Sequence, residues 1–284
     1  MTEELQLDVS RETPPARGRR RYTSMAKTVL LQLGALGLFL GIWEVLTATD
    51  VIPSYLLPRA SEVLAALGRD VIDIITGGRM WTHFYTTLIE ILLGFFFSVV
   101  IGVAVGAVLS EFKTVQRATY PYIVAANATP RIAFAPLIVI WFGFDFASKI
   151  VMAVAVAVFP VIVNTMAGLA ATDRDDLRLM RSLGATRSQL LWRVRIPTAL
   201  PYLFAGFETA MLFAAVGAVI GEFMAGNAGL GYVTLLAQEL FRLDDGFAAI
   251  VLLSVQGFLL HRLVVIARRR LIFWQAEALV PQVK

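Results

Sequence analysis

Two long stretches without a charged residue constrain the fold most. Ile91 to Ser110 and Ile150 to Thr172 contain no Asp, Glu, Lys or Arg. A bilayer core about 30 Å thick needs roughly 20 apolar helical residues to cross it. The whole chain is 58% hydrophobic and 16% charged, against roughly 25% charged residues in soluble domains. We therefore predict an all-α polytopic membrane protein, which excludes an ordinary soluble enzyme, a disordered protein and a nucleic-acid-binding domain as first interpretations.

Four further stretches complete a set of six predicted spans, and the third is the least regular because Arg131 lies in it between two prolines. The predicted spans are 28–49, 86–110, 120–142, 150–172, 202–225 and 246–267. The transmembrane domain then covers residues 28–270. A disordered basic tail (1–27) precedes it, and a short C-terminal tail (271–284) follows it.

The distribution of positive charge predicts the orientation of these spans. With the N-terminus in the cytoplasm, eighteen Lys and Arg residues fall on the cytoplasmic side and five on the outside. Cytoplasmic loops of membrane proteins carry such an excess. We therefore expect both termini in the cytoplasm. The outer segment 50–85 is predicted to contain a surface helix at about 61–75, because its apolar residues recur at helical spacing.

Metal sites and thiol chemistry are not expected in this chain. Cysteine is absent and only two histidines are present, so thiolate ligands are excluded and a His-based metal site is not predicted. We assign no catalytic residue.

Small residues recur four positions apart within the predicted spans, as at Gly102 and Gly106 and at Gly217 and Gly221. This spacing lets helix backbones approach closely in lipid. We interpret it as packing within the bundle, with a dedicated dimer face as the alternative.

The loop between the fourth and fifth spans, 173–201, carries two short apolar faces on either side of Gly184. The first face is Leu177, Met180 and Leu183, and the second is Leu190, Leu191 and Val194. A glycine permits the positive φ of a turn between two helices. The loop is therefore predicted to be a helix–turn–helix that buries its apolar faces against the underside of the bundle or against another protein.

The same loop resembles the EAA loop of ABC importer permeases. Gly184 is followed after nine residues by Val194-Arg195-Ile196-Pro197, which is similar to the end of that motif. The segments Pro136-Leu-Ile-Val-Ile-Trp-Phe-Gly-Phe, Ser148-Lys-Ile and Gly229-Leu-Gly-Tyr resemble the nitrate/sulfonate/taurine branch of the family. The resemblance covers about residues 30 to 270. Arg178 stands where the family has a glutamate, and Asp175 or Asp176 could supply that charge one turn earlier.

The resemblance implies a type I ABC importer permease in a bacterial cytoplasmic membrane. The chain has no Walker A motif, so ATP and Mg²⁺ would be bound by a separate ATPase present in two copies. The other expected partners are a second permease copy, a periplasmic or lipid-anchored solute-binding protein and membrane lipid. The solute would be small and anionic, such as nitrate, a sulfonate or taurine. The residues expected to couple to the ATPase are Leu177, Met180, Leu183, Gly184, Ala185, Leu190, Leu191, Val194, Ile196 and Pro197.

Polar residues inside the predicted spans are candidates for the transport pathway, because charged groups in a membrane usually face protein or water. The candidates are Asn127, Thr129, Pro130, Arg131, Glu208 and Glu222. Arg131 could meet an anionic solute, reach the cytoplasmic interface or pair with Glu90. Glu222 precedes a glycine-rich segment that resembles a mobile turn, where it could line a gate.

Two other classes of protein remain as alternatives. A secondary transporter or channel would work without an ATPase and would carry paired ionisable groups deep in its spans. An intramembrane enzyme would need clustered catalytic side chains, whereas the two histidines, His83 and His261, lie on opposite sides of the predicted topology.

Overall fold

A computed structural model describes residues 17–275, and the chain divides into two compact units, 1–61 and 62–284. Within the first unit, α1 (Arg17–Ala48) is followed by a loop tied back to the helix end. The indole N–H of Trp43 donates to the carbonyl of Pro58 at 2.9 Å, and the hydroxyl of Ser61 donates to the carboxylate of Glu44 at 2.8 Å.

The predicted disordered tail, 1–27, needs a correction over its second half. Helix α1 begins at Arg17, so residues 17–27 are helical rather than disordered. Adding residues to an existing helix is far easier than starting one, and the apolar span supplies the nucleus. Residues 1–16 of that tail and residues 276–284 of the predicted C-terminal tail lie outside the described residues.

The remaining elements are helical. They are α2 (Ala60–Ile75), α3 (Arg79–Glu111), α4 (Lys113–Ala128), η1 (Arg131–Phe134), α5 (Ala135–Phe142), α6 (Phe146–Ala170), α7 (Arg174–Ser182), α8 (Arg187–Leu190), η2 (Leu191–Arg195), α9 (Ile196–Ala225), α10 (Leu230–Glu239), α11 (Leu243–Leu271) and η3 (Phe273–Gln275). The all-α fold class is confirmed, and α2 forms a helix at the residues where one was predicted in the segment 50–85.

Five helical segments of the described chain are long and apolar enough to cross a membrane. They are Lys27–Ala48, Arg79–Glu111, Phe146–Ala170, Arg187–Ala225 and Leu243–Leu271. The third predicted span, 120–142, is not one straight helix, because Thr114–Ala128 and Arg131–Phe142 meet at 84°. Pro130 at the break lacks a backbone N–H and disfavours helix in the residue before it. Counting this bent pair as one span gives the predicted six.

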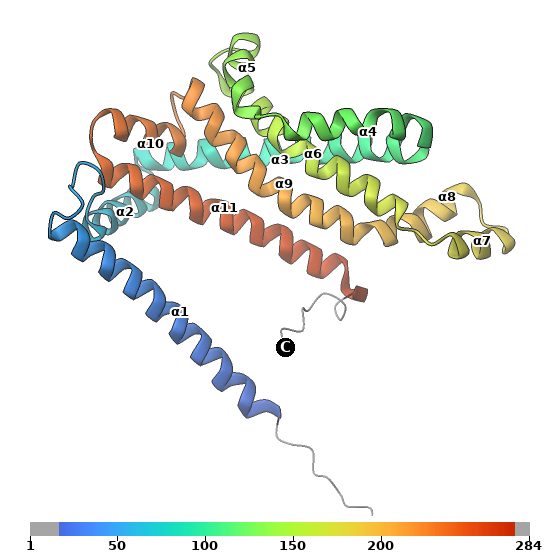
Figure 1. Cartoon of the computed structure of the whole chain (residues 1–284), viewed down its shortest axis with the longest axis horizontal. Coiled ribbons are helices and arrows are strands. Elements are labelled where there is room, and N and C mark those ends of the chain that lie inside the picture. Colours follow the sequence, from blue (N-terminus) through green and yellow to red (C-terminus); the bar gives the residue numbers. More distant parts are fainter. Residues whose placement is uncertain (1–16, 276–284) are drawn as a thin grey trace, which may run out of the picture. The chain divides into compact units, whose positions relative to one another are not determined.

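Helix α6 packs against both α3 and α9, and α11 packs against α9 (Figure 1). These contacts need small residues. A Cβ added to Gly106 of α3 would lie 2.7 Å from the Cβ of Thr165, and one added to Gly217 of α9 would lie 2.6 Å from the Cα of Ala153. The predicted close packing within the bundle is confirmed for these glycines.

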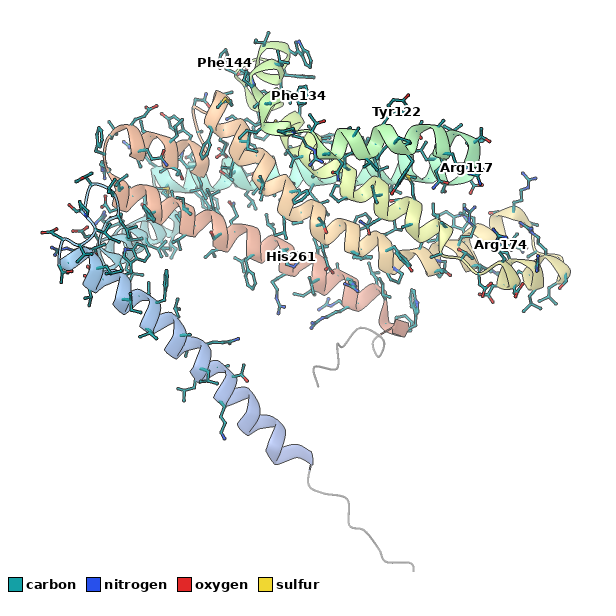
Figure 2. All side chains as sticks on the ribbon, in the orientation of Figure 1. Arg117, Tyr122, Phe134, Phe144, Arg174 and His261 are labelled. Carbon is teal, nitrogen blue, oxygen red and sulfur yellow. The ribbon has the colours of Figure 1, made fainter. Side chains whose placement is uncertain are left out.

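Large apolar side chains also cover the outside of the second unit. Tyr122 of α4, Phe134 of η1 and Phe144 after α5 project away from the bundle (Figure 2) and are 75%, 45% and 71% exposed. An exposed apolar surface of this extent suits lipid or another subunit.

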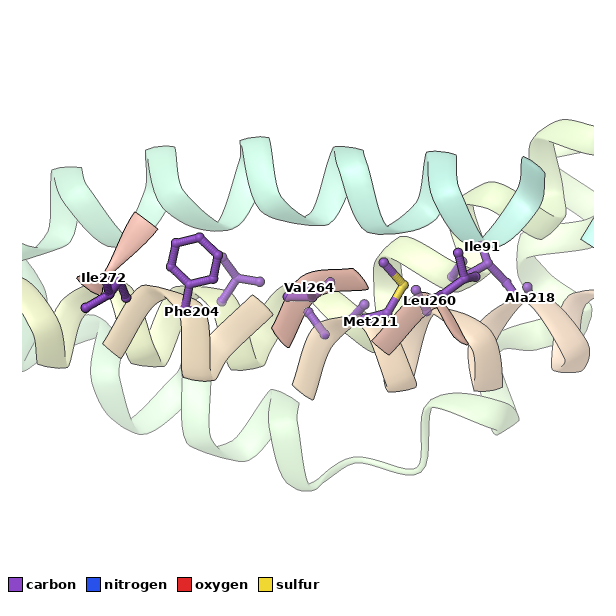
Figure 3. Close-up of a cluster of buried hydrophobic side chains, with 12 residues drawn as sticks. Ile91, Phe204, Met211, Ala218, Leu260, Val264 and Ile272 are labelled. Atoms are coloured by element: carbon purple, nitrogen blue, oxygen red, sulfur yellow. The ribbon is translucent and has the colours of Figure 1, made fainter. Parts of the chain in front are cut away.

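The main hydrophobic core runs along the inner faces of α3, α6, α9 and α11 (Figure 3). Its larger labelled members include Ile91, Phe204, Met211 and Leu260, and alanines fill the narrow places between them. The loop 173–201 emerges at one end of this packed bundle, where α6 ends and α9 begins (Figure 1).

Candidate functional site

The loop 173–201 folds as two short helices whose ends are fixed by local hydrogen bonds. The side chain of Asp173 accepts the backbone N–H of Asp175 at 2.9 Å and so caps α7. Gly184 ends that helix with φ of +80°, a conformation that glycine adopts without steric cost. Thr186 and Gln189 then form a reciprocal capping box that starts α8.

The second of these helices continues without a break into α9, which carries the fifth predicted span. Helix α8 passes through one turn of π-helix, η2, into α9. Arg195 in η2 pairs with Glu111 at the end of α3. The loop is therefore joined to α9 through a continuous helical segment and to the end of α3 through an ion pair.

The apolar residues of the loop divide into an inner and an outer set. Leu190 is buried against the bundle. Leu177, Met180, Ala185, Leu191, Val194, Ile196 and Pro197 are partly buried, and Gly184 is exposed. Leu183 is 74% exposed and its neighbour Leu179 is 60% exposed. The loop thus docks on its own bundle through one set and leaves a second apolar set open.

A buried cluster of charge lies elsewhere in the bundle, between α3, α6 and α9. The Nζ of Lys149 lies 3.3 Å from Oε1 of Glu90, and both side chains are almost wholly buried. Glu222 is buried beside them with no exposed surface. In the structure the partner of Glu90 is therefore Lys149, and the predicted alternative of a pair with Arg131 is not formed.

Glu222 fastens the glycine-rich turn to the bundle. Its Oε1 accepts from the hydroxyl of Thr87 at 2.6 Å, and its Oε2 accepts from the backbone N–H of Gly231 at 2.5 Å. Thr87 in turn accepts the backbone N–H of Leu230 at 2.8 Å. These bonds satisfy free N–H groups at the start of α10, where a carboxylate is favoured.

Arg131 lies at the break between α4 and α5, where its guanidinium group is held by backbone carbonyls. It donates to the carbonyl of Val156 at 3.1 Å and to that of Asn127 at 2.9 Å, and it lies over the ring of Phe159. Asn127 also accepts through its side-chain oxygen. Thr129 and Pro130 form the extended backbone of the break. The structure therefore groups four of the six candidate pathway residues at this bend.

The other two candidates, Glu208 and Glu222, lie apart from the bend. Glu208 forms an ion pair with Arg268 at 3.1 Å, with both side chains mostly buried. This pair links α9 to the last turns of α11. No group of three or more His, Cys, Asp or Glu side chains suited to a metal ion occurs within residues 17–275.

Sequence reasoning missed the burial of Glu90 and Lys149. Lys149 sits directly before a charge-free stretch, at a position that also suits the outer membrane interface. The one sequence feature that could have indicated a buried Lys149 was its place in the segment Ser148-Lys-Ile, which resembles the permease family. Hydropathy alone cannot distinguish a lysine at the interface from one that pairs inside the bundle.

Comparison with known proteins places this architecture among transport proteins. Residues 98–273 match the family model described as binding-protein-dependent transport system inner membrane component. The formylaminopyrimidine transport permease protein ThiX of Halalkalibacterium halodurans is 33% identical over 85% of this chain and 92% of its own length. The riboflavin transport system permease protein RibX of Chloroflexus aurantiacus is 32% identical over 95% of this chain and 98% of its own.

A further relative and a solved structure agree with this placement. The taurine transport system permease protein TauC of Escherichia coli is 30% identical over 89% of this chain and 92% of its own length. The inward-facing MetNI methionine ABC transporter contains a chain with the same fold, at a TM-score of 0.59 and 19% identity, over 67% of this chain and 96% of that one. The chain therefore belongs to the family of binding-protein-dependent transport system inner membrane components, the permeases of ABC importers whose ATP is bound and hydrolysed by a partner subunit.

Proposed function

We propose that this chain forms, as a homodimer, the translocation pathway of an ATP-driven importer for a small anionic solute, and that loop 173–201 couples it to the ATPase. Family membership supplies the coarser statement, a multi-pass inner-membrane permease that works with an ATPase and a binding protein. The coupling role, the dimer and the class of solute are the proposed refinements.

The coupling role is supported by the way the apolar residues of the loop are divided between a set that packs on the bundle and a set that is exposed. Leu179 and Leu183 are largely exposed on α7 while Leu190 holds α8 against the bundle. Exposed leucines beside a rigid attachment are what a docking helix needs. A partner that moves these residues pulls on α9 through the continuous η2 segment, which supports near-rigid transmission.

The proposal of a dimer rests on large apolar side chains that one copy of the chain leaves exposed. Ile140 and Trp141 of α5 are 74% and 69% exposed, and they lie in the same half of the bent pair as Arg131. Broken helices within a membrane are tolerated where they line a cavity or are covered by protein. A second copy placed over α4 and α5 would cover this break and enclose a pathway.

The proposed anionic solute is supported by Arg131. Its Nε has no hydrogen-bond partner among the described residues, and its charge has no carboxylate in an ion pair. The names of three relatives refer to formylaminopyrimidine, riboflavin and taurine transport, so those names by themselves do not select one solute for this chain. A sulfonate or a similar anion is the class that this chain's uncompensated arginine favours.

The experiment that tests the coupling role is co-purification of the tagged full-length chain with its ATPase in mild detergent. We expect Leu179→Asp combined with Leu183→Asp to lose the ATPase, because two carboxylates would enter an apolar contact. Phe241→Asp, at an 84% exposed residue in the turn after α10, is the matched control and should retain it. Full retention by the double variant would refute coupling through this loop.

The test of the solute uses the assembled transporter in liposomes with its binding protein. Solute uptake should be ATP-dependent, and Arg131→Gln should reduce uptake of a sulfonate at least tenfold while leaving ATPase co-purification intact. Uptake that proceeds equally well without ATP would favour a secondary transporter instead.

A further inference from the structure

A cavity of about 900 Å³ lies between the coupling loop and the ends of the long helices α3 and α6. Its walls come from the last residues of α3 and α6, from α7 and α8, and from η2. Because α3 and α6 are both long enough to cross a membrane, we place their ends near the lipid headgroups. Figure 2 shows Arg174 at this end of the bundle.

The charge of the cavity wall is strongly one-sided. Four arginines line it, Arg174, Arg181, Arg187 and Arg195, against the single acidic residue Glu111. Glu111 already pairs with Arg195. Within residues 17–275 the other three arginines have no ion-pair or hydrogen-bond partner. Three solvent-exposed arginines therefore line one cavity without an ion-pair partner among the described residues.

A second, independent feature points to a ligand in the same cavity. Thr172 lines it and is only 9% exposed. Its hydroxyl has no hydrogen-bond partner among the described residues. A buried hydroxyl without a partner costs free energy, and a ligand that accepts its hydrogen bond would recover that cost.

The chemistry of this wall selects a phosphate group. Guanidinium groups bind phosphate oxygens through paired N–H donors, with higher specificity than single ammonium groups. Leu169, Leu177 and Leu190 line the cavity as well, and they suit the glycerol and upper acyl carbons of a lipid. Basic pockets between membrane helices on the cytoplasmic side bind acidic headgroups.

We infer that this cavity, beyond the proposed transport function, is a binding site for the phosphate group of an anionic phospholipid. The bound phosphate would accept hydrogen bonds from Arg174, Arg181 and Arg187 and would brace the coupling loop against the ends of α3 and α6. The same phosphate chemistry could come from soluble phosphate, and an acidic surface of the ATPase is the competing occupant; the experiment separates these sources.

The experiment measures binding of phosphatidylglycerol to the full-length, detergent-purified chain by native mass spectrometry, with phosphatidylcholine as the zwitterionic comparison. Arg174→Gln, Arg181→Gln and Arg187→Gln are combined in one variant. We expect its affinity for phosphatidylglycerol to fall at least tenfold, with phosphatidylcholine binding unchanged. Thr172→Val is a second variant that keeps every charge, and a threefold or greater loss is expected for it.

The control variant carries the same change in net charge away from the cavity. Arg117, Arg193 and Arg269 are exposed and do not line it, and their combined replacement by Gln should leave lipid binding within twofold of the original chain. If both triple variants lose phosphatidylglycerol binding equally, the lipid is attracted only by general positive charge, and the site is refuted. If both variants retain binding equally, the site is also refuted.

Two further outcomes separate the sources of the phosphate. Displacement of phosphatidylglycerol by millimolar inorganic phosphate would overturn the lipid assignment in favour of a soluble anion. Retention of lipid by the cavity variant, together with loss of the co-purifying ATPase, would overturn it in favour of protein docking.

Discussion

At the scale of single residues, Lys149 holds a buried cluster together. Its ammonium group faces the carboxyl group of Glu90, with Glu222 beside them. Removing one partner of a buried ion pair leaves the other uncompensated, at a cost of about 3–5 kcal/mol. We expect Lys149→Met to lower the free energy of unfolding by about this amount, measured by thermal unfolding of the detergent-purified chain.

The control for this cluster is the double variant Lys149→Met with Glu90→Gln. It should be less destabilised than the single variant, because an amide replaces the stranded carboxylate. An unchanged melting temperature in Lys149→Met would contradict the cluster's role in stability.

Asp70 of α2 gives a pH-dependent prediction. Partial burial, with the nearby carboxylate of Asp245, raises the pKa of Asp70 from 3.8 to about 6. Asp73 adds to this, whereas Arg69 and Arg242 oppose it. The native state therefore binds more protons than the unfolded state between about pH 4 and 6, so stability falls as the pH rises through this window.

The variant Asp70→Asn tests this sign. Above pH 6 it should be more stable than the original chain by about 1 kcal/mol, a value reduced because solvent screens the half-exposed side chain. Near pH 4 the difference should disappear, and thermal unfolding at both pH values measures it. A larger gain at low pH than at high pH would refute the raised pKa.

At the scale of elements, the approach of α3 to α6 depends on glycine. A Cβ at Gly106 would lie 2.7 Å from the Cβ of Thr165 and 2.9 Å from the carbonyl oxygen of Ile162. We expect Gly106→Ala to cost about 1–3 kcal/mol by overpacking, seen as a lower melting temperature. Gly257→Ala in α11 is the control and should be neutral, because its new Cβ would meet its nearest neighbour at 4.0 Å.

The sequence predicted most elements because the physics that sets them is local. Long apolar stretches, two of them free of charge, predicted the spans, and the apolar spacing of 61–75 predicted α2. The bend at Pro130 was visible only as a pair of prolines, since its 84° angle depends on how α5 packs against α6 and α9. The extension of α1 back to Arg17 was missed because polar composition resembles disorder whether or not a neighbouring helix continues through it.

At the scale of the whole molecule, the orientation in the membrane is testable because the chain has no cysteine. Single cysteines can be introduced at two exposed residues, Ala118 in α4 and Thr76 after α2. The positive-inside distribution predicts that a membrane-impermeant maleimide labels Thr76→Cys in intact cells and Ala118→Cys only in inverted vesicles. The reverse pattern would refute cytoplasmic termini.

The sequence by itself determined the class of this protein, its spans and its family. Length, absence of charge and the Gly184–Pro197 spacing are properties of neighbouring residues, and the bilayer imposes them directly on the chain. The same sequence information indicated which residues were candidates for the loop 173–201 and for the transport pathway.

Only the tertiary structure decided which distant side chains meet. Lys149 pairs with Glu90, Glu222 caps α10, and four arginines gather at one cavity. Lys149 and Glu90 lie 59 positions apart, and they meet because α3 packs against α6. The other two contacts join nearer residues, but they also depend on how the chain turns back on itself. Pairing of buried charge is therefore a consequence of helix packing, which no local pattern in the chain encodes.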